Sequence, residues 1–194
     1  MDLILASSSP YRQSMLGRLG MPFTAVSPNV DETPHPGERP IDLALRLSVT
    51  KAHAVAQLRP GTVVIGSDQV ATIGDEPIGK PGDFERARRQ LQQLSGQPVD
   101  FHSALCVTDG NRDMVADVIT RCRFRELSDD EITSYLKREE PYDTAGSAKA
   151  EGLGIALMDS MQSDDPTAII GLPLIELCRM LRAFGLNPLN PDLH

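Results

Sequence analysis

Residues 3–23 read LILASSSPYRQSMLGRLGMPF, and this stretch decides the fold of the chain. Its first four residues are a short apolar run, which predicts a buried strand. Three serines follow, and then Met15, Leu16 and Leu19 recur at helical spacing. Pro10 lies where the first helical turn should begin, and Gly20 lies where the helix should end. The stretch therefore predicts a strand that passes through a serine-rich turn into a helix.

The serine-rich turn has the composition of an anion-binding site. Backbone N–H groups, hydroxyls and the positive end of a helix dipole converge on one point there. Arg12, in the first helical turn, adds a guanidinium whose fork of donors matches phosphate. The alternative is a turn whose serines only cap the helix. Geometry alone leaves both interpretations open.

Composition restricts the class of protein. The 194 residues are 40% hydrophobic and 24% charged, as in ordinary globular proteins, and they carry a net charge of −8. That charge argues against a nucleic-acid partner, because a phosphate backbone needs a cationic surface. It leaves room for a local basic pocket that binds one nucleotide.

Cysteine usage and the N-terminus bear on the compartment. Cys106, Cys122 and Cys178 match no zinc spacing and no disulfide framework, so we expect free thiols in a reducing compartment. The N-terminal apolar run is too short for a signal peptide, and no apolar stretch is long enough to span a membrane. The sequence therefore predicts a cytoplasmic location and no membrane partner.

The rest of the chain alternates between strand and helix patterns, which predicts an α/β fold with a central mixed sheet and flanking helices. The expected strands are 23–26, 62–65, the two arms of a hairpin over 70–78, 99–108, 114–124 and 154–158. The expected helices are 40–58, 83–94, 128–137, which opens on a capping box, and a final helix from Pro173 to about residue 184. Residues 187–194 predict a flexible tail.

Four further charged side chains occupy informative positions. Glu32 lies in a proline-rich loop, Lys51 lies within the helix 40–58, Asp68 follows a β-branched run, and Lys80 follows the hairpin. A carboxylate just beyond a buried strand lies at the sheet edge, where open α/β sheets place their sites. Each of the four also has an ordinary interpretation, as a solvated charge or as the start of a turn.

Together these residues resemble the motifs of the Maf family of nucleoside triphosphate pyrophosphatases. Ser9 and Arg12 match the family's Ser-x-x-Arg signature, and Glu32 falls in its Val-Asp-Glu motif. Lys51 matches its helix lysine before an alanine, Asp68 lies in the string GSDQV, and Lys80 lies in IGKP. The resemblance extends to about residue 189.

The resemblance implies a reaction and a site. The family hydrolyses the bond between the α- and β-phosphates with a divalent metal, Mg²⁺ or Mn²⁺, and it folds as two lobes around a cleft. Asp68 is then the general base and a metal ligand, and Glu32 is a second metal carboxylate. The residues expected to bind the phosphates are Ser9, Arg12, Lys51 and Lys80. One domain is expected over residues 1–194, and the sequence leaves the lobe boundary open.

Three positions bear on substrate choice within the family. Tyr11, Gln69 and Glu151 resemble the branch that acts on 7-methyl-GTP, although that branch more often has tryptophan where this chain has Tyr11. An aromatic face attracts the cationic 7-methylguanine ring. A carboxylate at Glu151 accepts hydrogen bonds from the guanine N1–H and 2-amino groups and repels the acceptor edge of uracil.

Several alternatives remain open at this point. The chain could be a dTTP or UTP pyrophosphatase of the same family. It could be a non-catalytic nucleotide-binding regulator of cell division, or a structural α/β domain without a site. The expected partner is a small-molecule nucleotide, and the sequence leaves the oligomeric state open, with a homodimer as one alternative.

Overall fold

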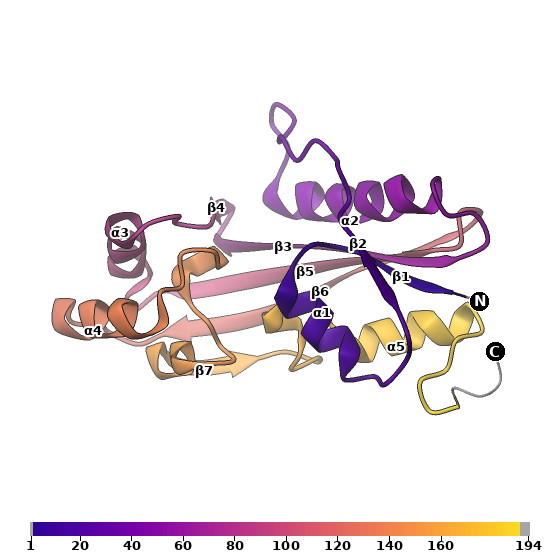
Figure 1. Ribbon diagram of the computed structural model, residues 1–194. Coiled ribbons are helices and arrows are strands. Elements are labelled where there is room, and N and C mark those ends of the chain that lie inside the picture. The colour runs from indigo at the N-terminus through magenta and orange to yellow at the C-terminus, as the bar shows by residue number, and fades with distance from the viewer. Residues whose placement is uncertain (1, 191–194) are drawn as a thin grey trace.

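One mixed sheet runs through the molecule from end to end (Figure 1). The computed structural model describes residues 2–190, and within them the strand order is β2-β1-β3-β5-β6-β7, with β4 paired to β3. The strands are β1 (Leu3–Ala6), β2 (Thr24–Val26), β3 (Val63–Ile73), β4 (Glu76–Ile78), β5 (Pro98–Thr108), β6 (Asp113–Phe124) and β7 (Met158–Gln162). β1 is parallel to β2 and β3, and every other pairing is antiparallel. The predicted mixed sheet is confirmed.

Helices cover both faces of this sheet. They are α1 (Pro10–Gly17), α2 (Pro40–Ala56), α3 (Phe84–Leu94), α4 (Asp129–Glu139) and α5 (Leu174–Ala183). The 3₁₀ segments are η1 (Ala145–Ser147), η2 (Leu153–Leu157) and η3 (Ala168–Ile170). In Figure 1, α2 lies on one face, α1 and α5 lie on the other, and α3 and α4 lie at the far end of the long strands. Within residues 2–190, no helix has the length and apolar character needed to cross a membrane.

The hydrophobic core is divided between two lobes that share strands. In the first lobe, α1 and α5 bury Leu16 and Leu177 against one face of the sheet, and α2 buries Val55 against the other. In the second lobe, α3 and α4 bury Leu91 and Leu136 against the far ends of the strands. Because β3 and β5 contribute to both cores, the lobes are two ends of one sheet. Whether the whole of 1–194 is a single domain stays a prediction.

β3 is longer than the sequence predicts, and this changes the setting of Asp68. The expected strand 62–65 continues to Ile73, because β5 pairs with it as far as Thr72. β1 ends opposite Gly66, and β4 pairs only from Ala71. Residues 67–70 therefore have β5 on one side and a bare edge on the other. Asp68 lies in the middle of a strand, so its expected position beyond a strand end is wrong.

Gly66 allows α2 to lie directly on β3. A Cβ at this position would stand 2.1 Å from the carbonyl oxygen of Ser48 and 2.8 Å from the backbone nitrogen of Ala52, distances no real contact permits. The absence of a side chain thus brings the α2 backbone against the strand. Lys51 lies on α2 between Ser48 and Ala52, so this close packing places its side chain at the bare edge of β3.

Three local predictions need correction. The expected strand 154–158 is the 3₁₀ segment η2, and β7 begins only at Met158. The first helix ends at Gly17, and its chain then turns through Gly20 at a positive φ of 68°. Helix α2 ends at Ala56, and Leu58, expected on its apolar face, is 74% exposed.

The structure describes the first four residues of the predicted tail, 187–190. Residues 187–190 form a turn in which the Asn190 N–H donates to the Asn187 carbonyl at 2.9 Å. Residues 191–194 lie outside the described part of the chain.

Candidate active site

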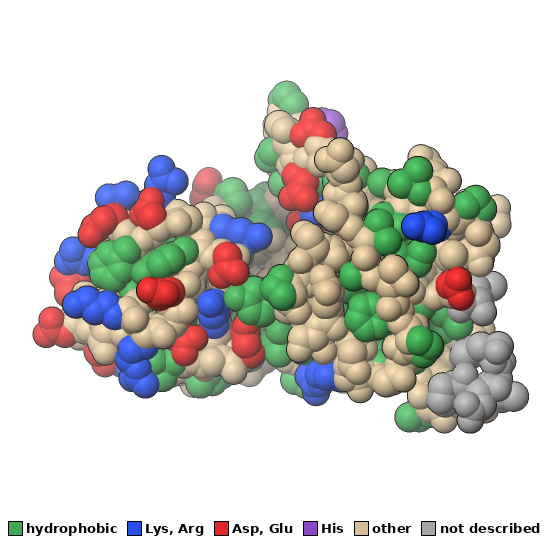
Figure 2. All heavy atoms as spheres, viewed as in Figure 1, with side chains coloured by type: hydrophobic (Ala, Val, Ile, Leu, Met, Phe, Trp, Pro, Cys, Tyr) green, Lys and Arg blue, Asp and Glu red, His purple; other side chains and the backbone are tan. Residues whose placement is uncertain are grey.

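A pocket of about 540 Å³ lies between the two lobes, at the bare edge of β3. Figure 2 shows the hollow on this face of the molecule. Every residue singled out from the sequence lines it: Ser9, Tyr11, Arg12, Glu32, Lys51, Asp68, Gln69, Lys80 and Glu151. Residues far apart in the chain thus meet at one place.

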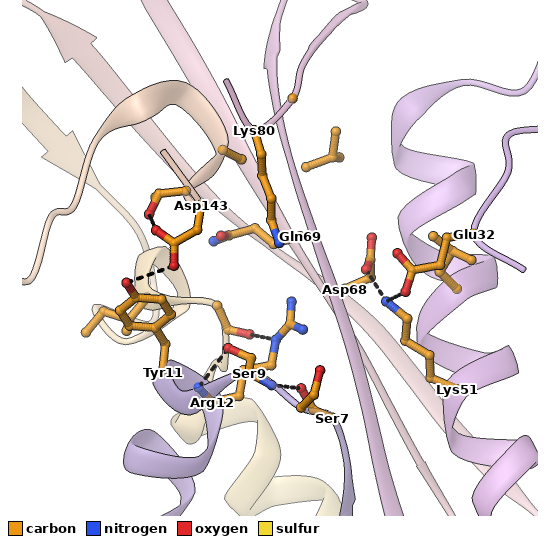
Figure 3. Close-up of a pocket in the computed structure, with 18 of the residues that line it drawn as sticks. Ser7, Ser9, Tyr11, Arg12, Glu32, Lys51, Asp68, Gln69, Lys80 and Asp143 are labelled. Atoms are coloured by element: carbon orange, nitrogen blue, oxygen red, sulfur yellow. Dashed lines mark hydrogen bonds and ion pairs between the residues drawn. The ribbon is translucent and has the colours of Figure 1, made fainter. Parts of the chain in front are cut away.

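The turn between β1 and α1 is organised by its serines. The Ser9 hydroxyl caps α1 by accepting from the Arg12 N–H at 3.4 Å, and the Ser9 N–H donates to Ser7 Oγ at 3.1 Å (Figure 3). Capping uses only a lone pair of the Ser9 oxygen, so its O–H remains a donor. The capping and anion-binding interpretations are therefore compatible at the same residue.

Arg12 is anchored at one nitrogen and free at the others. Its Nε donates to the Gly171 carbonyl at 3.0 Å, and the Ser67 hydroxyl donates to the same oxygen at 3.0 Å. Its terminal nitrogens bond to no other residue within 2–190, which leaves them to a ligand. Burial lowers the pKa of the Arg12 guanidinium from its ordinary value, while the carboxylates of Asp68 and Glu32 act in the opposite direction.

Lys51 bridges two carboxylates on the other side of the pocket. Its Nζ lies 2.7 Å from Asp68 Oδ1 and 2.9 Å from Glu32 Oε1 (Figure 3). The Lys51 side chain is 7% exposed, that of Asp68 17%, and that of Glu32 58%. A buried ammonium needs such partners, because an unpaired charge is costly to bury. Lys51 therefore fixes the position of Asp68 and keeps it next to the pocket.

Lys80 approaches the same pocket from the second lobe. It is exposed, and its side chain makes no ion pair or hydrogen bond with the rest of the described chain. In Figure 3 the side chain extends toward Gln69. A free ammonium opposite Arg12 allows an anion to be held from both lobes.

Gln69 lies on the opposite face of β3 from Asp68, and its amide is held in a single orientation. Its Nε2 donates to the carbonyls of Ile169 at 3.0 Å and Ala168 at 3.2 Å, and it lies 3.1 Å from Ser103 Oγ. The Ser103 hydroxyl donates to the Ala168 carbonyl at 2.6 Å. With both amide hydrogens used, only the Gln69 oxygen remains available to a ligand, as an acceptor.

Tyr11 marks the end of the pocket nearest the second lobe. Its hydroxyl donates to Asp143 Oδ2 at 3.2 Å (Figure 3). The ammonium of Lys149 lies 6.0 Å from the centroid of the Tyr11 ring and 3.9 Å from Asp143 Oδ1. Glu151, in the same segment, is exposed and lines the pocket. The Tyr11 ring thus lies next to the Asp143 carboxylate, and Glu151 adds a further carboxylate to the pocket wall.

Comparison with known protein families shows to which family this chain belongs. The family model described as "Maf-like protein" matches residues 2–184. The chain belongs to the Maf family. The resemblance inferred from the motifs is therefore confirmed.

Curated relatives agree with this classification, and one solved structure shares the fold. A protein of Bordetella pertussis is 71% identical over 188 residues, covering 97% of this chain and 94% of the relative. One of Burkholderia thailandensis is 58% identical over 188 residues, covering 94% and 87%. Both relatives are named 7-methyl-GTP pyrophosphatase. A HAM1 protein from Coxiella burnetii is 16% identical, covers 94% of this chain and 99% of that chain, and has a TM-score of 0.55, which shows a shared fold alone.

The carboxylates of this Maf site fit a magnesium-type ion. No cluster of three or more histidine, cysteine or acidic side chains suited to a metal occurs in residues 2–190. Mg²⁺, however, is usually held by one or two carboxylates together with waters and substrate phosphates. Asp68 and Glu32 supply such a pair of hard oxygen donors at the edge of the pocket. The donor set thus suits an ion that arrives with its nucleotide.

Three residues of the site were missed by the sequence analysis. Asp143 lies eight residues before Glu151, but its carboxylate was not singled out. Ser103 lies within a strand, and Gly171 anchors Arg12 through its carbonyl group. Neither of these two carries a local signal, because each acts through a contact that only the folded chain makes.

Proposed function

We propose that this chain is a nucleoside triphosphate pyrophosphatase whose substrate is 7-methyl-GTP. It hydrolyses the α–β phosphoanhydride bond and releases a nucleoside monophosphate and pyrophosphate. The observation that carries the proposal is the convergence of Arg12, Lys51, Lys80, Asp68 and Glu32 on one pocket. The names of the relatives at 71% and 58% identity support the choice of substrate.

The triphosphate binds where the cationic groups gather. The turn before α1 offers the Ser9 hydroxyl and a helix N-terminus, and Arg12 offers its free terminal nitrogens. Lys80 closes on the phosphates from the second lobe, and Lys51 adds a third cation. These donors neutralise the charge that spreads over the phosphate oxygens in the transition state.

Asp68 orients and deprotonates the attacking water. Its carboxylate is held by Lys51 at 2.7 Å, so its second oxygen has a fixed direction at the pocket wall. The rigid centre of β3 places this oxygen, which is the condition for general-base catalysis at a defined phosphorus. Asp68 and Glu32 would also hold the divalent cation, Mg²⁺ or Mn²⁺. When bound, such an ion supplies further neutralisation of the phosphate oxygens.

The base binds at the end that carries Tyr11, Gln69 and Glu151. Guanine presents two adjacent donors, N1–H and the 2-amino group, and this end offers two acceptors, the Gln69 oxygen and the Glu151 carboxylate. Uracil and thymine present one donor between two acceptors, which a carboxylate repels. The positive charge of 7-methylguanine is attracted by the Tyr11 ring, by ~0.5–2 kcal/mol for such a pair.

A panel of nucleotides tests the proposal. The purified chain is incubated with 7-methyl-GTP, GTP, UTP and dTTP, with Mg²⁺, with Mn²⁺ or with a chelator, and pyrophosphate and orthophosphate are measured separately. We expect pyrophosphate release that is fastest for 7-methyl-GTP and is lost with the chelator. Faster hydrolysis of UTP or dTTP would assign the chain to the other branch. Binding without hydrolysis would favour a regulator.

Two secondary proposals accompany this function. An enzyme that removes modified nucleotides from the cellular nucleotide pool acts where that pool is, so we place this chain in the cytoplasm. The three free cysteines are consistent with this reducing compartment. We also propose that residues 1–194 act as one domain, since β3 and β5 belong to both cores.

A further inference from the structure

Asp143 makes a contact that links the two lobes at the mouth of the pocket. Tyr11 belongs to α1 in the first lobe, whereas Asp143 follows α4 in the second, 132 residues along the chain. The Tyr11 hydroxyl donates to the Asp143 carboxylate at 3.2 Å, and both side chains line the pocket. In Figure 3 a dashed line joins the Tyr11 hydroxyl to the Asp143 carboxylate.

This hydrogen bond constrains the Tyr11 ring. A tyrosine on a short helix can turn about two side-chain torsions, and the bond to Asp143 restricts both by holding the far end of the ring. A carboxylate acceptor also draws the phenolic proton toward itself, which raises the electron density of the ring. An electron-rich ring at a fixed angle attracts a cationic base more strongly than a mobile one.

Lys149 lies close enough to weaken the attraction of the Tyr11 ring for a cationic base. Its ammonium is 3.9 Å from Asp143 Oδ1 and 6.0 Å from the Tyr11 ring centroid, and its side chain is 18% exposed. Lys149 does not line the pocket, whereas Asp143 does. Its charge therefore weakens the attraction of the ring and the carboxylate for a second cation, without touching that cation.

We propose that Asp143 is a positioning residue for recognition of the charged base, acting by holding the Tyr11 ring in place against the substrate. The inference rests on the function proposed above and extends it by one residue. It applies to the cationic ring of 7-methylguanine and not to neutral guanine, since both present the same hydrogen-bonding edge to Gln69 and Glu151.

The test compares kcat/KM for 7-methyl-GTP with that for GTP in each variant. Because these substrates share every hydrogen-bonding group on the guanine edge, the ratio isolates the methyl group and its charge. We expect the ratio to fall about three- to tenfold in Asp143→Ala and by a similar factor in Tyr11→Phe, a cation–π contribution of ordinary size. The double variant should lose no more than either single variant, because both remove the same bond.

Two further variants separate positioning from charge. Asp143→Asn keeps an acceptor for the phenolic proton, so we expect it to restore most of the ratio lost in Asp143→Ala. Lys149→Met should leave the ratio unchanged or raise it. Asp159→Asn, an exposed carboxylate on β7 outside the pocket, is the matched control for loss of one negative charge.

The outcomes distinguish this inference from the proposed function. If the unmodified chain prefers 7-methyl-GTP and Asp143→Ala keeps that preference, the inference is overturned and the function stands. The inference also fails if Lys149→Met lowers the ratio as much as Asp143→Ala, because the ion pair then carries the effect. If the unmodified chain hydrolyses neither nucleotide, the proposed function fails first and the inference fails with it.

Discussion

The two ends of the pocket are built in different ways. At the end proposed to bind the phosphates, Arg12, Lys51 and Asp68 extend from α1, α2 and β3, and each has a close partner. At the end proposed to bind the base, Tyr11 is hydrogen-bonded to Asp143, and Glu151 lines the same pocket; both carboxylates are exposed and lie in irregular segments between α4 and β7. Chemistry at phosphorus requires fixed geometry, and fixed geometry comes from buried secondary structure. Selection among bases needs only a surface that can vary without disturbing the sheet.

The largest effect that this comparison predicts is at Asp68. In Asp68→Asn we expect kcat for 7-methyl-GTP to fall about 10³-fold, within the range for loss of a general base. The asparagine oxygen can still accept from Lys51, so the fold should persist. Steady-state kinetics and circular dichroism measure the two quantities. Asp75→Asn, in the turn between β3 and β4, is the control, and near-normal turnover in Asp68→Asn would remove this residue from the mechanism.

The second prediction tests whether the close packing of α2 on β3 is what brings Lys51 to Asp68. A Cβ in Gly66→Ala would meet the Ser48 carbonyl oxygen at 2.1 Å, so α2 must move away from β3. We expect about 2–4 kcal/mol less stability in urea unfolding, together with weaker catalysis as Lys51 leaves Asp68. Gly17→Ala is the control, because a Cβ there meets nothing within 4 Å. Unchanged stability in Gly66→Ala would contradict the close packing.

The third prediction concerns the clamp on Gln69, meaning the hydrogen bonds from its amide nitrogen to Ser103, Ala168 and Ile169. Ser103→Ala removes the hydroxyl that joins the Gln69 amide to the Ala168 carbonyl. We expect KM for 7-methyl-GTP to rise about fivefold with little change in kcat, since one neutral hydrogen bond contributes about 1 kcal/mol. Ser163→Ala, whose hydroxyl donates to the Ile119 carbonyl, is the matched control. A loss confined to kcat would instead place the clamp at the phosphate end.

The smallest predicted effect lies at the exposed base end. In Glu151→Gln we expect hydrolysis of 7-methyl-GTP to weaken more than that of UTP, by about threefold in the ratio of kcat/KM, because an exposed interaction is screened by solvent. Both nucleotides are measured by pyrophosphate release. Glu85→Gln, on the exposed surface of α3, controls for charge. Equal losses on both substrates would count against the specificity assignment.

Much of the fold could be predicted because its signals are local. The capping box at Ser128 and Glu131 begins α4, and the turn at Gly74 and Asp75 joins β3 to β4, both as expected. The length of β3 could not be predicted, because Gly66 and Ser67 interrupt the apolar run and only pairing with β5 continues the strand. The strand expected over 154–158 is instead a 3₁₀ segment, because Gly154 packs directly against the backbone of Lys149 and its N–H donates to the Lys149 carbonyl rather than to a neighbouring strand.

The site was predictable through motifs and not through spacing. Nothing in the chain order indicates that Arg12 meets Gly171, or that Tyr11 meets Asp143; those contacts belong to the folded sheet. The motifs supplied residues that the structure brings to one pocket, while the roles assigned to them remain predictions. The residues that hold them, such as Ser103, had no motif.

The shared strands β3, β5 and β6 have a mechanical consequence. β5 is paired along nearly its whole length to both neighbours, so any hinge between the lobes would have to break several of these backbone hydrogen bonds at once. A sheet paired in this way resists bending. Any movement that admits a ligand therefore falls to the segments at the rim, the proline-rich loop that carries Glu32 and the stretch from Asp143 to Glu151, while Asp68 keeps its place within β3.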